Sequence, residues 1–502
     1  MRKTVNIIGS GFAGLSAACM LAKEGIQVKV FEKNEQIGGR ARQFSAAGFT
    51  FDMGPSWYWM PDVFEDFFQQ FGKSVSDYYD LRQLDPGFCI YFGKGDKMDI
   101  PANEVEIYDL FEKIEKGSAK RLKQFLKEAA YKYEVGMKDL VYQPSHSHLE
   151  FIDIRLIKSV FKMGVFESFS KHARKFFTNP KLLQLIEFPV LFLGAMPKDT
   201  PALYSLMNYS ALSQGTWYPM GGMHKIVEGL KTLADSLGVE FHTDMDVAQI
   251  EVEQKTAKGI TVNGEFYPAD FTLSTADYHF SETQLLAKEH QSYSAKYWDS
   301  RVMAPSSLLF YLGVDKKIEG LEHHNLFFDA PFEAHAEKIY KTPGYPENPL
   351  FYACCPSKTD ASVAPAGKEN LFLLIPLAPD LEDNATIREK YYEKVMTRLE
   401  SLLGVDIKKS VIYKRSYAIK DFKQDYNAFK GNAYGLANTL LQTASLKPKL
   451  RSKKVKNLYY AGQLTVPGPG VPPSLISGTV AAREITKRIS QTTQIFDYEK
   501  TV

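Results

Sequence analysis

A glycine-rich turn near the start of the sequence carries the clearest chemical signal. Gly9, Gly11 and Gly14 form the pattern Gly-x-Gly-x-x-Gly, and Glu32 follows eighteen positions after the last glycine. In such a turn the first glycine permits a tight bend, the second lets the backbone approach a pyrophosphate, and the third lets a helix pack closely. The acid can accept hydrogen bonds from ribose hydroxyls. These residues, with Phe12 inside the turn, predict an adenine dinucleotide site.

The identity of the dinucleotide follows from the next residues. A carboxylate at position 32 repels a 2′-phosphate, which disfavours NADP and leaves FAD and NAD. The segment Gly38-Gly39-Arg40-Ala41 adds a second glycine pair and an arginine, which suit further phosphate contacts. An NAD site has no obvious need of such a segment, so FAD is favoured.

A second glycine-rich segment stands near the other end of the chain. Gly462 and Gln463 lead into a Pro-Gly repeat and then Val471, directly before a long predicted helix. A helix N-terminus carries a partial positive charge. Aimed at the pyrimidine end of a reduced flavin, it would stabilise negative charge there.

The elements that must position these residues are scattered along the chain. A strand at 4–8, a helix at about 13–24 and a strand at 27–32 form a βαβ opening, because buried runs alternate with an amphipathic stretch. Further predicted elements are a helix at about 223–237, strands near 239–242, 247–254, 257–262, 271–274 and 458–460, and a helix at about 474–489. Asn263-Gly264 predicts a tight hairpin turn. We expect residues 491–502 to be a loose tail.

Composition excludes several classes of protein. The chain has 61 Lys and Arg residues against 59 Asp and Glu residues, so it has no overall positive electrostatic field that would attract nucleic acid. Its four cysteines include no Cys-x-x-Cys pair, which fits a reducing, cytoplasmic setting. The longest strongly apolar run, 188–196, is too short to span a bilayer, so any membrane contact must be peripheral.

Two pairs of neighbouring residues need separate interpretation. Cys354 and Cys355 are adjacent, but a vicinal disulfide is strained, so we interpret them as ordinary strand residues. His323 and His324, like His146 with His148, lack companion ligands at helical spacing. We therefore expect surface histidines and no metal site.

Four segments together resemble the bacterial-type phytoene desaturases of the carotenoid and retinoid oxidoreductase family. They are residues 9–41, the FDMGPSW stretch at 51–57, the YPMGGM stretch at 218–223, and NLYYAGQLTVPGPGVPPSLISG at 457–478. The similarity runs from the first strand to about residue 490. The ending departs from the family's usual form, in which a glycine or alanine and then Thr-His tend to precede the Pro-Gly, because Gln463-Leu464-Thr465-Val466 stand here.

The resemblance implies an α/β fold with an FAD-binding Rossmann-like domain of the glutathione-reductase and amine-oxidase type. This domain would be discontinuous, comprising 1–72, 217–290 and 453–490. Residues 73–100 and 291–452 would form a substrate domain with a mixed sheet, and 101–216 a helical subdomain that faces the membrane.

By position, the resemblance also implies contacts with FAD. Those with the adenosine and pyrophosphate are Ala13, Glu32, Lys33, Gly39 and Arg40. The backbone of Val247 would meet the adenine, and Gly54 and Pro55 would border the flavin. Gly462, Gln463 and Val471 would lie at its ribityl and pyrimidine ends. No side chain is assigned a catalytic role.

The family's activity is desaturation of a long isoprenoid hydrocarbon, in which a hydride passes to flavin N5 and a neighbouring carbon loses a proton. Such a substrate has no polar group that a binding site could recognise, so its recognition requires an apolar tunnel. Conversion of phytoene to a lycopene-type product is favoured, with 3,4-desaturation of a hydroxylated or monocyclic carotene next and a thirty-carbon substrate also possible. Either a quinone or oxygen would accept the electrons.

An insoluble hydrocarbon must be drawn from a bilayer, so we expect a cytoplasmic enzyme that associates peripherally with a membrane. The candidate docking segment is 151–181, where basic residues alternate with phenylalanine, leucine and isoleucine. Packing of this basic segment on the protein's own core is the alternative.

Two other functions remain open. Flavin amine oxidases share the N-terminal fingerprint, so an amine is an alternative substrate. Rab escort and GDP-dissociation-inhibitor proteins resemble the glycine-rich opening yet bind prenylated proteins without using a flavin. The complete N-terminal glycine set and the Gly462-Gln463 ending favour a working cofactor site over such a carrier.

Overall fold

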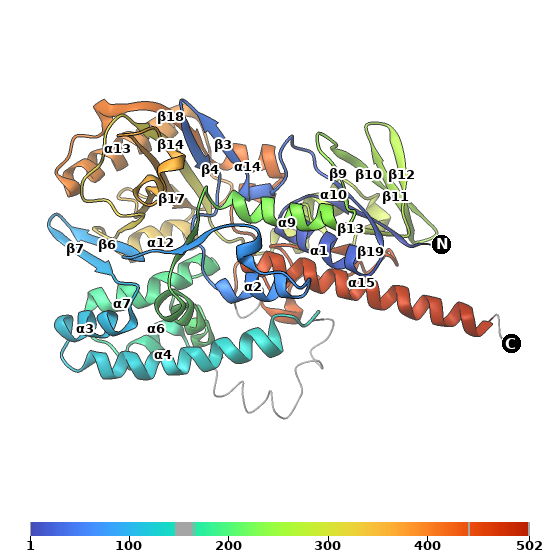
Figure 1. Ribbon diagram of the computed structural model, residues 1–502, viewed down its shortest axis with the longest axis horizontal. Coiled ribbons are helices and arrows are strands. Elements are labelled where there is room, and N and C mark those ends of the chain that lie inside the picture. Colours follow the sequence, from blue (N-terminus) through green and yellow to red (C-terminus); the bar gives the residue numbers. More distant parts are fainter. Residues whose placement is uncertain (1, 146–163, 166, 440–441, 500–502) are drawn as a thin grey trace.

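The computed structural model describes residues 2–145, 164–165, 167–439 and 442–499. Figure 1 shows two sheet-containing regions side by side, with a group of helices beneath one of them. The long C-terminal helix α15 (Val471–Glu499) runs along the region that contains the N-terminus.

A five-stranded parallel sheet forms the region around the N-terminus. Its order is β19-β13-β1-β2-β9, which joins segments from three distant parts of the chain. The strands are β1 (Thr4–Ile8), β2 (Gln27–Phe31), β9 (Glu240–His242), β13 (Phe271–Ser274) and β19 (Leu458–Tyr460). The predicted βαβ opening and the later predicted strands of this sheet are confirmed.

Three helices pack around this sheet: α1 (Phe12–Lys23), α9 (His224–Ser236) and α15. Helices α1 and α15 approach so closely that a Cβ at Gly478 would lie 2.0 Å from the carbonyl oxygen of Ala13. Ser16 Oγ also donates a hydrogen bond to the Leu475 carbonyl at 2.8 Å. The last helix thus locks the first in place.

A small antiparallel sheet covers the edge of this region. It consists of β10 (Val247–Glu253), β11 (Thr256–Val262) and β12 (Glu265–Pro268). Asn263 and Gly264, with φ of 51° and 81°, form the predicted turn between β11 and β12. Strand β12 itself was not predicted, because its sequence, Glu-Phe-Tyr-Pro, lacks a clear alternation.

A mixed seven-stranded sheet forms the second region, in the order β18-β14-β17-β16-β15-β6-β7. Only the β15/β6 pair is parallel. The strands are β6 (Phe88–Gly93), β7 (Asp96–Ile100), β14 (Ser306–Val314), β15 (His324–Phe327), β16 (Phe351–Cys354), β17 (Glu369–Leu377) and β18 (Val411–Tyr417). Helix α13 (Ala385–Leu403) packs in the hydrophobic core on one face of this sheet. The mixed sheet agrees with the expectation for a substrate domain.

Helices form most of the described part of 101–216, including α3 (Glu104–Ile114), α4 (Ser118–Val135), α6 (Phe169–Ala173) and α7 (Pro180–Glu187). Within the candidate docking segment, Phe169 and Phe177 are fully buried, and Lys175 and Lys181 form ion pairs with Glu167 and Asp96. These side chains of the described part therefore follow the alternative, in which the segment packs on the protein's own core. Residues 146–163 and 166 lie outside the described residues.

Two further observations concern helices. No helix among the described residues combines the length and apolar character needed to cross a bilayer.

The expectation of a loose tail at 491–502 is wrong up to Glu499, because α15 continues through that residue. Because the sequence after residue 489 is mostly polar, it gave no amphipathic pattern from which this last part of α15 could be predicted. The domain boundaries given above stay a prediction.

Candidate active site

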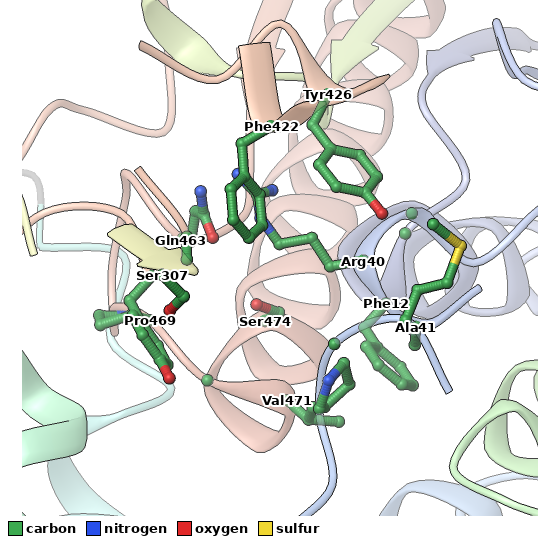
Figure 2. A pocket seen from close by; sticks show the side chains of 18 of the residues that line it. Phe12, Arg40, Ala41, Ser307, Phe422, Tyr426, Gln463, Pro469, Val471 and Ser474 are labelled. Atoms are coloured by element: carbon green, nitrogen blue, oxygen red, sulfur yellow. The ribbon is translucent and has the colours of Figure 1, made fainter. Parts of the chain in front are cut away.

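A cavity of about 470 Å³ runs between the parallel sheet and the seven-stranded sheet. At one end it is lined by the glycine turn after β1 and the end of β2. At the other end it is lined by apolar side chains of β14, β15 and β17. Figure 2 shows its middle, where residues of α1, α14 (Ile419–Tyr426) and the start of α15 surround the same space. One continuous cavity therefore joins a polar end to an apolar end.

The three glycines of the first turn have different roles. Gly9 has φ of +95°, a conformation that favours glycine. A Cβ at Gly14 would lie 2.2 Å from the carbonyl oxygen of Gly9, so this glycine permits the close contact between turn and helix. A Cβ at Gly11 would meet no heavy atom within 4 Å. Gly11 therefore faces open space in the cavity, where a ligand can reach the backbone.

Glu32 lies at the end of β2, in the cavity wall, and is 6% exposed. One carboxylate oxygen accepts hydrogen bonds from Ser10 N and Ser10 Oγ at 3.0 and 2.6 Å. The other accepts from Asn34 N and Asn34 Nδ2 at 3.0 and 2.7 Å. A carboxylate has about four lone-pair positions, so the protein itself uses all of them. A ribose hydroxyl must share or displace one of these donors.

Arg40 provides a partly buried positive charge in the cavity wall. Its Nε has no hydrogen-bond partner among the described residues, and one terminal nitrogen donates to the Asn432 carbonyl at 3.2 Å. Burial lowers the pKa of Arg40, while Tyr426 and Asp277 oppose that effect. A guanidinium with a buried Nε and no ion pair in the described part of the chain is poorly satisfied, and an anionic group in the cavity would satisfy it.

The C-terminal glycine segment closes the other side of this part of the cavity. Gly462 N donates to Ser477 Oγ at 3.0 Å, which ties the segment to α15. At the start of α15, Pro472 and Pro473 carry no N–H, and Ser474 N donates to Gly470 O at 3.0 Å. The N–H of Val471 is thus the backbone donor that this helix end offers to the cavity.

Most of the residues predicted from the sequence come together here. Those that line the cavity are Gly9, Gly11, Phe12, Ala13, Glu32, Lys33, Gly39, Arg40, Gly54, Pro55, Val247, Gly462, Gln463 and Val471. Gly14 does not line the cavity, because it lies beneath the turn against Gly9. Its role is to hold the shape of the turn.

The sequence analysis missed the wall that α14 provides. Phe422 and Tyr426 lie beside Arg40 in Figure 2, and the Arg40 guanidinium is 4.9 Å from the centre of the Tyr426 ring. Lys33 Nζ also donates to the Gln424 carbonyl at 2.8 Å, which joins the two regions. No pattern in the sequence marks α14 as part of a binding site, since its residues meet the turn only through the tertiary fold.

The apolar end of the cavity is lined mainly by hydrocarbon side chains. They include Leu309, Leu326, Phe328, Phe332, Leu350 and Leu374. Among them stand the hydroxyl groups of Ser307, Tyr340 and Tyr434, and burial raises the pKa of Tyr434 to about 12. His335 donates from Nε2 to Pro376 O and accepts at Nδ1 from Leu350 N, so it is a neutral, fully bonded ring. This end suits a long apolar molecule.

The histidine pair is buried, so the expectation that it lies on the surface is wrong. His323 and His324 are 4% and 0% exposed, between the seven-stranded sheet and the cavity wall. The His324 ring stacks on Trp57 with ring centres 4.2 Å apart. Cys354 and Cys355 are free, buried thiols at the end of β16, as expected of strand residues.

Comparison with known families and sequences gives consistent results. The family described as flavin containing amine oxidoreductase matches residues 12–486. A carotenoid 3,4-desaturase of Haloarcula japonica is 41% identical over 97% of this chain and 98% of its own length. A 4,4′-diapophytoene desaturase of Staphylococcus haemolyticus is 32% identical over 97% of this chain and 99% of its own length. A zeta-carotene-forming phytoene desaturase of Myxococcus xanthus is 30% identical over 97% of this chain and 94% of its own length.

Solved structures share the fold at low identity. An oxidoreductase from Methanosarcina mazei has a TM-score of 0.63 and 18% identity, over 96% of this chain and 100% of that chain. Putrescine oxidase has a TM-score of 0.58 and 13% identity, over 97% and 99%. A Rab GDI from Plasmodium falciparum has a TM-score of 0.54 and 12% identity, over 97% and 98%. Since an amine oxidase and a Rab GDI both share the fold at low identity, structural likeness alone does not separate the functional hypotheses.

Proposed function

Since the chain belongs to the flavin containing amine oxidoreductase family and, within it, to the carotenoid desaturases, we propose that it desaturates a long isoprenoid hydrocarbon with FAD as its cofactor. The single observation that carries this proposal is the continuous cavity, polar at the glycine turn and apolar at the seven-stranded sheet. An amine substrate would instead require a negatively charged anchor, such as a carboxylate, deep in the apolar end. No carboxylate is among the described residues that line this end, and His335 there is a neutral ring whose two nitrogens are already bonded within the protein.

The residues of the polar end fit FAD. Arg40 Nε lacks a partner that a phosphate would supply, and the open space beside Gly11 lets a pyrophosphate approach the backbone. The Val471 N–H at the start of α15 suits the electron-rich edge of a flavin. When bound, FAD supplies the two-electron acceptor of the reaction.

The chain's own residues then have three tasks. Removal of a hydride from one carbon and a proton from its neighbour leaves a new double bond, so both carbons must be held in register. The leucine side chains of β14, β15 and β17, together with Phe328 and Phe332, orient the hydrocarbon and exclude water. Ring faces near the cavity also favour positive charge on an allylic carbon.

Two observations favour 3,4-desaturation over the phytoene reaction that the sequence alone favours. The Haloarcula japonica relative, which is named a carotenoid 3,4-desaturase, shares 41% of its residues, against 30% for the phytoene desaturase of Myxococcus xanthus. The hydroxyls of Ser307, Tyr340 and Tyr434 also give the apolar end of the cavity hydrogen-bonding groups that a hydroxylated carotene would engage. Phytoene remains the second candidate substrate.

The test is to incubate the FAD-loaded protein with liposomes that each contain one carotene, hydroxylated or not, and to separate the products by chromatography. We expect a product with a longer conjugated system, formed fastest from the hydroxylated carotene. Running the reaction under air and under nitrogen with a quinone identifies the electron acceptor. Peroxide release from amines without carotene turnover would favour an amine oxidase. A colourless protein that takes up no FAD would favour a carrier.

Peripheral membrane association remains part of this proposal, because the substrate is insoluble in water. Its support is the basic and apolar sequence of 151–163, since the later phenylalanines Phe169 and Phe177 are buried in the core. The variant with Phe161→Ser, Phe166→Ser, Lys158→Glu and Lys162→Glu should float less with anionic liposomes than the unaltered protein. Unchanged flotation would contradict this assignment.

A further inference from the structure

Three side chains with metal-binding atoms meet behind the wall of the main cavity. The ligand atoms of His323, His324 and Cys354 all lie within 4.8 Å of one another. His324 on β15 and Cys354 on β16 are direct partners across the two antiparallel strands, and His323 precedes β15. We call these three residues the histidine–cysteine cluster. All three are less than 5% exposed.

The hydrogen bonds of the two histidines leave one nitrogen of each ring unused. His323 Nδ1 bonds to Thr359 Oγ1 at 2.8 Å, and His324 Nδ1 bonds to the Tyr352 hydroxyl at 2.5 Å. The Nε2 atoms of both rings are buried and have no partner among the described residues. Buried polar atoms without a partner are unfavourable, so this arrangement requires an explanation.

The Tyr352 hydroxyl determines which nitrogen of His324 carries the hydrogen. It donates its single hydrogen to Ser56 Oγ at 3.0 Å. His324 Nδ1 must then donate to the tyrosine oxygen, which leaves Nε2 as a bare lone pair. A hydroxyl partner on one ring nitrogen and a free lone pair on the other is the arrangement of histidines that bind metals.

A small cavity beside the cluster offers space and charge. Its volume is about 20 Å³, and its wall includes Asp52, Tyr218, His323 and Cys354. That is enough for one water molecule or one ion. The Asp52 carboxylate, which accepts from Met223 N at 2.7 Å and His224 N at 3.1 Å, adds a potential negative charge.

We propose that His323, His324 and Cys354 bind one zinc-class divalent cation. Two imidazoles and a thiolate are ligands that zinc prefers, whereas magnesium and calcium require oxygen ligands. Binding releases the Cys354 thiol proton to solvent, and the resulting thiolate together with the Asp52 carboxylate balances the two positive charges. Three protein ligands leave a fourth position for a water molecule in the small cavity.

The bound cation ties β15 to β16 at the point where both strands meet the main cavity. Through His324 it also fixes Tyr352, which lines that cavity and contacts Ser56. This site goes beyond the proposed function, because it depends on neither FAD nor a carotene. Its failure would leave the desaturase assignment unchanged.

The test is zinc binding to the purified, FAD-containing protein after treatment with a chelator. We expect one zinc per chain by elemental analysis. In the zinc K-edge X-ray absorption spectrum, we expect one sulfur at about 2.3 Å and two nitrogens at about 2.0 Å. Flavin absorbance does not interfere with this measurement and reports separately whether the protein stays folded around its cofactor.

Neighbouring cysteines supply a matched pair of variants. Cys354→Ala should abolish the zinc–sulfur contact and weaken zinc binding by at least roughly 100-fold, since loss of an outer partner alone weakens it by about 10- to 100-fold. Cys355→Ala, at a site also fully buried, should bind zinc like the unaltered protein. If Cys354→Ala does not fold, His324→Gln should lose one zinc–nitrogen contact instead.

Several results would overturn the proposal. One is an unaltered protein that binds no zinc or shows only oxygen around it, which would mean that a water molecule fills the small cavity. Another is retention of the zinc–sulfur contact in Cys354→Ala, or its loss in Cys355→Ala with the flavin still bound.

Discussion

The polar end of the main cavity and the histidine–cysteine cluster both contain buried nitrogen atoms that make no hydrogen bond with the described residues. Arg40 Nε in the first region and two histidine Nε2 atoms in the second are buried and have no partner among the described residues. The first region presents a positive charge and suits an anion, whereas the second presents lone pairs and suits a cation. Residues 9–41 encode most of the first region continuously, but the second depends on the alignment of two strands.

The largest expected effect tests whether Arg40 makes the first region bind anions. Arg40→Met should weaken FAD binding by about 2–5 kcal/mol, the usual range for truncating one partner of a buried charge pair. Stability of the FAD-free protein should not fall, because the variant removes a partly buried charge that has no ion pair with any described residue. Titration of the FAD-free protein with FAD measures the first effect, and thermal unfolding measures the second.

Arg42→Met is the matched control. Arg42 does not line the cavity, and it pairs with Asp425 at 2.6 Å. Its loss should lower stability and change FAD affinity by less than about threefold, which is under 1 kcal/mol. Equal loss of FAD from both variants would mean that overall charge, rather than the cavity wall, attracts the cofactor, and the contrast between the two regions would disappear.

A pH-dependent effect of similar size comes from the acid that faces Arg40. Asp277 begins α10 (Tyr278–Thr283), and its two oxygens accept from Phe280 N and Phe429 N, each at 3.1 Å. Burial raises the pKa of Asp277 to about 6, against a model-compound value of 3.8. The folded protein therefore retains this proton at a pH where the unfolded chain has lost it.

The raised pKa of Asp277 determines how its contribution to stability depends on pH. The stabilisation is complete below about pH 4 and is lost as the pH rises through about 6, and it amounts to about 3 kcal/mol for a shift of this size. Asp277→Asn should remove this dependence. Urea unfolding of both proteins without FAD, across this pH range, measures the difference. If the unfolding free energies of the two proteins changed in parallel with pH, Asp277 would be solvated. The polar end of the cavity would then be more hydrated than the cluster.

The same contrast explains how much could be predicted from the sequence. The βαβ opening and most residues of the polar end were predictable, because a dinucleotide site combines glycine spacing, a strand and a helix within one short segment. The α14 wall was not, since Tyr426 reaches Arg40 only through the packing of two sheets. From the sequence alone the histidine–cysteine cluster is only two separate pairs of neighbours, because it is the β15–β16 register that places His324 opposite Cys354.

A smaller effect separates the two roles of glycine in the first region. Gly14→Ala places a Cβ 2.2 Å from the Gly9 carbonyl oxygen, so we expect a loss of about 1–3 kcal/mol in unfolding free energy. Gly11→Ala meets nothing within 4 Å and should leave stability nearly unchanged while weakening FAD binding. Thermal unfolding and FAD titration of both variants distinguish these outcomes. If Gly11→Ala destabilised the protein as much as Gly14→Ala, Gly11 would be a packing residue and the assignment of the pyrophosphate position would fail.

The smallest effect concerns Glu32, whose lone pairs are all used, unlike the histidine nitrogens of the cluster. Asn34→Ala removes one of the four hydrogen bonds to this carboxylate and should lower the unfolding free energy by about 1 kcal/mol. It also vacates a lone pair that a ribose hydroxyl can take, so FAD affinity should stay the same or rise. Ser10→Ala, which vacates a position on the other oxygen, is the control for the direction of approach. A tenfold loss of FAD affinity in Asn34→Ala would mean that Asn34 itself holds the ribose. Glu32 would then serve to position Asn34, which no spacing rule based on the acid alone could have indicated.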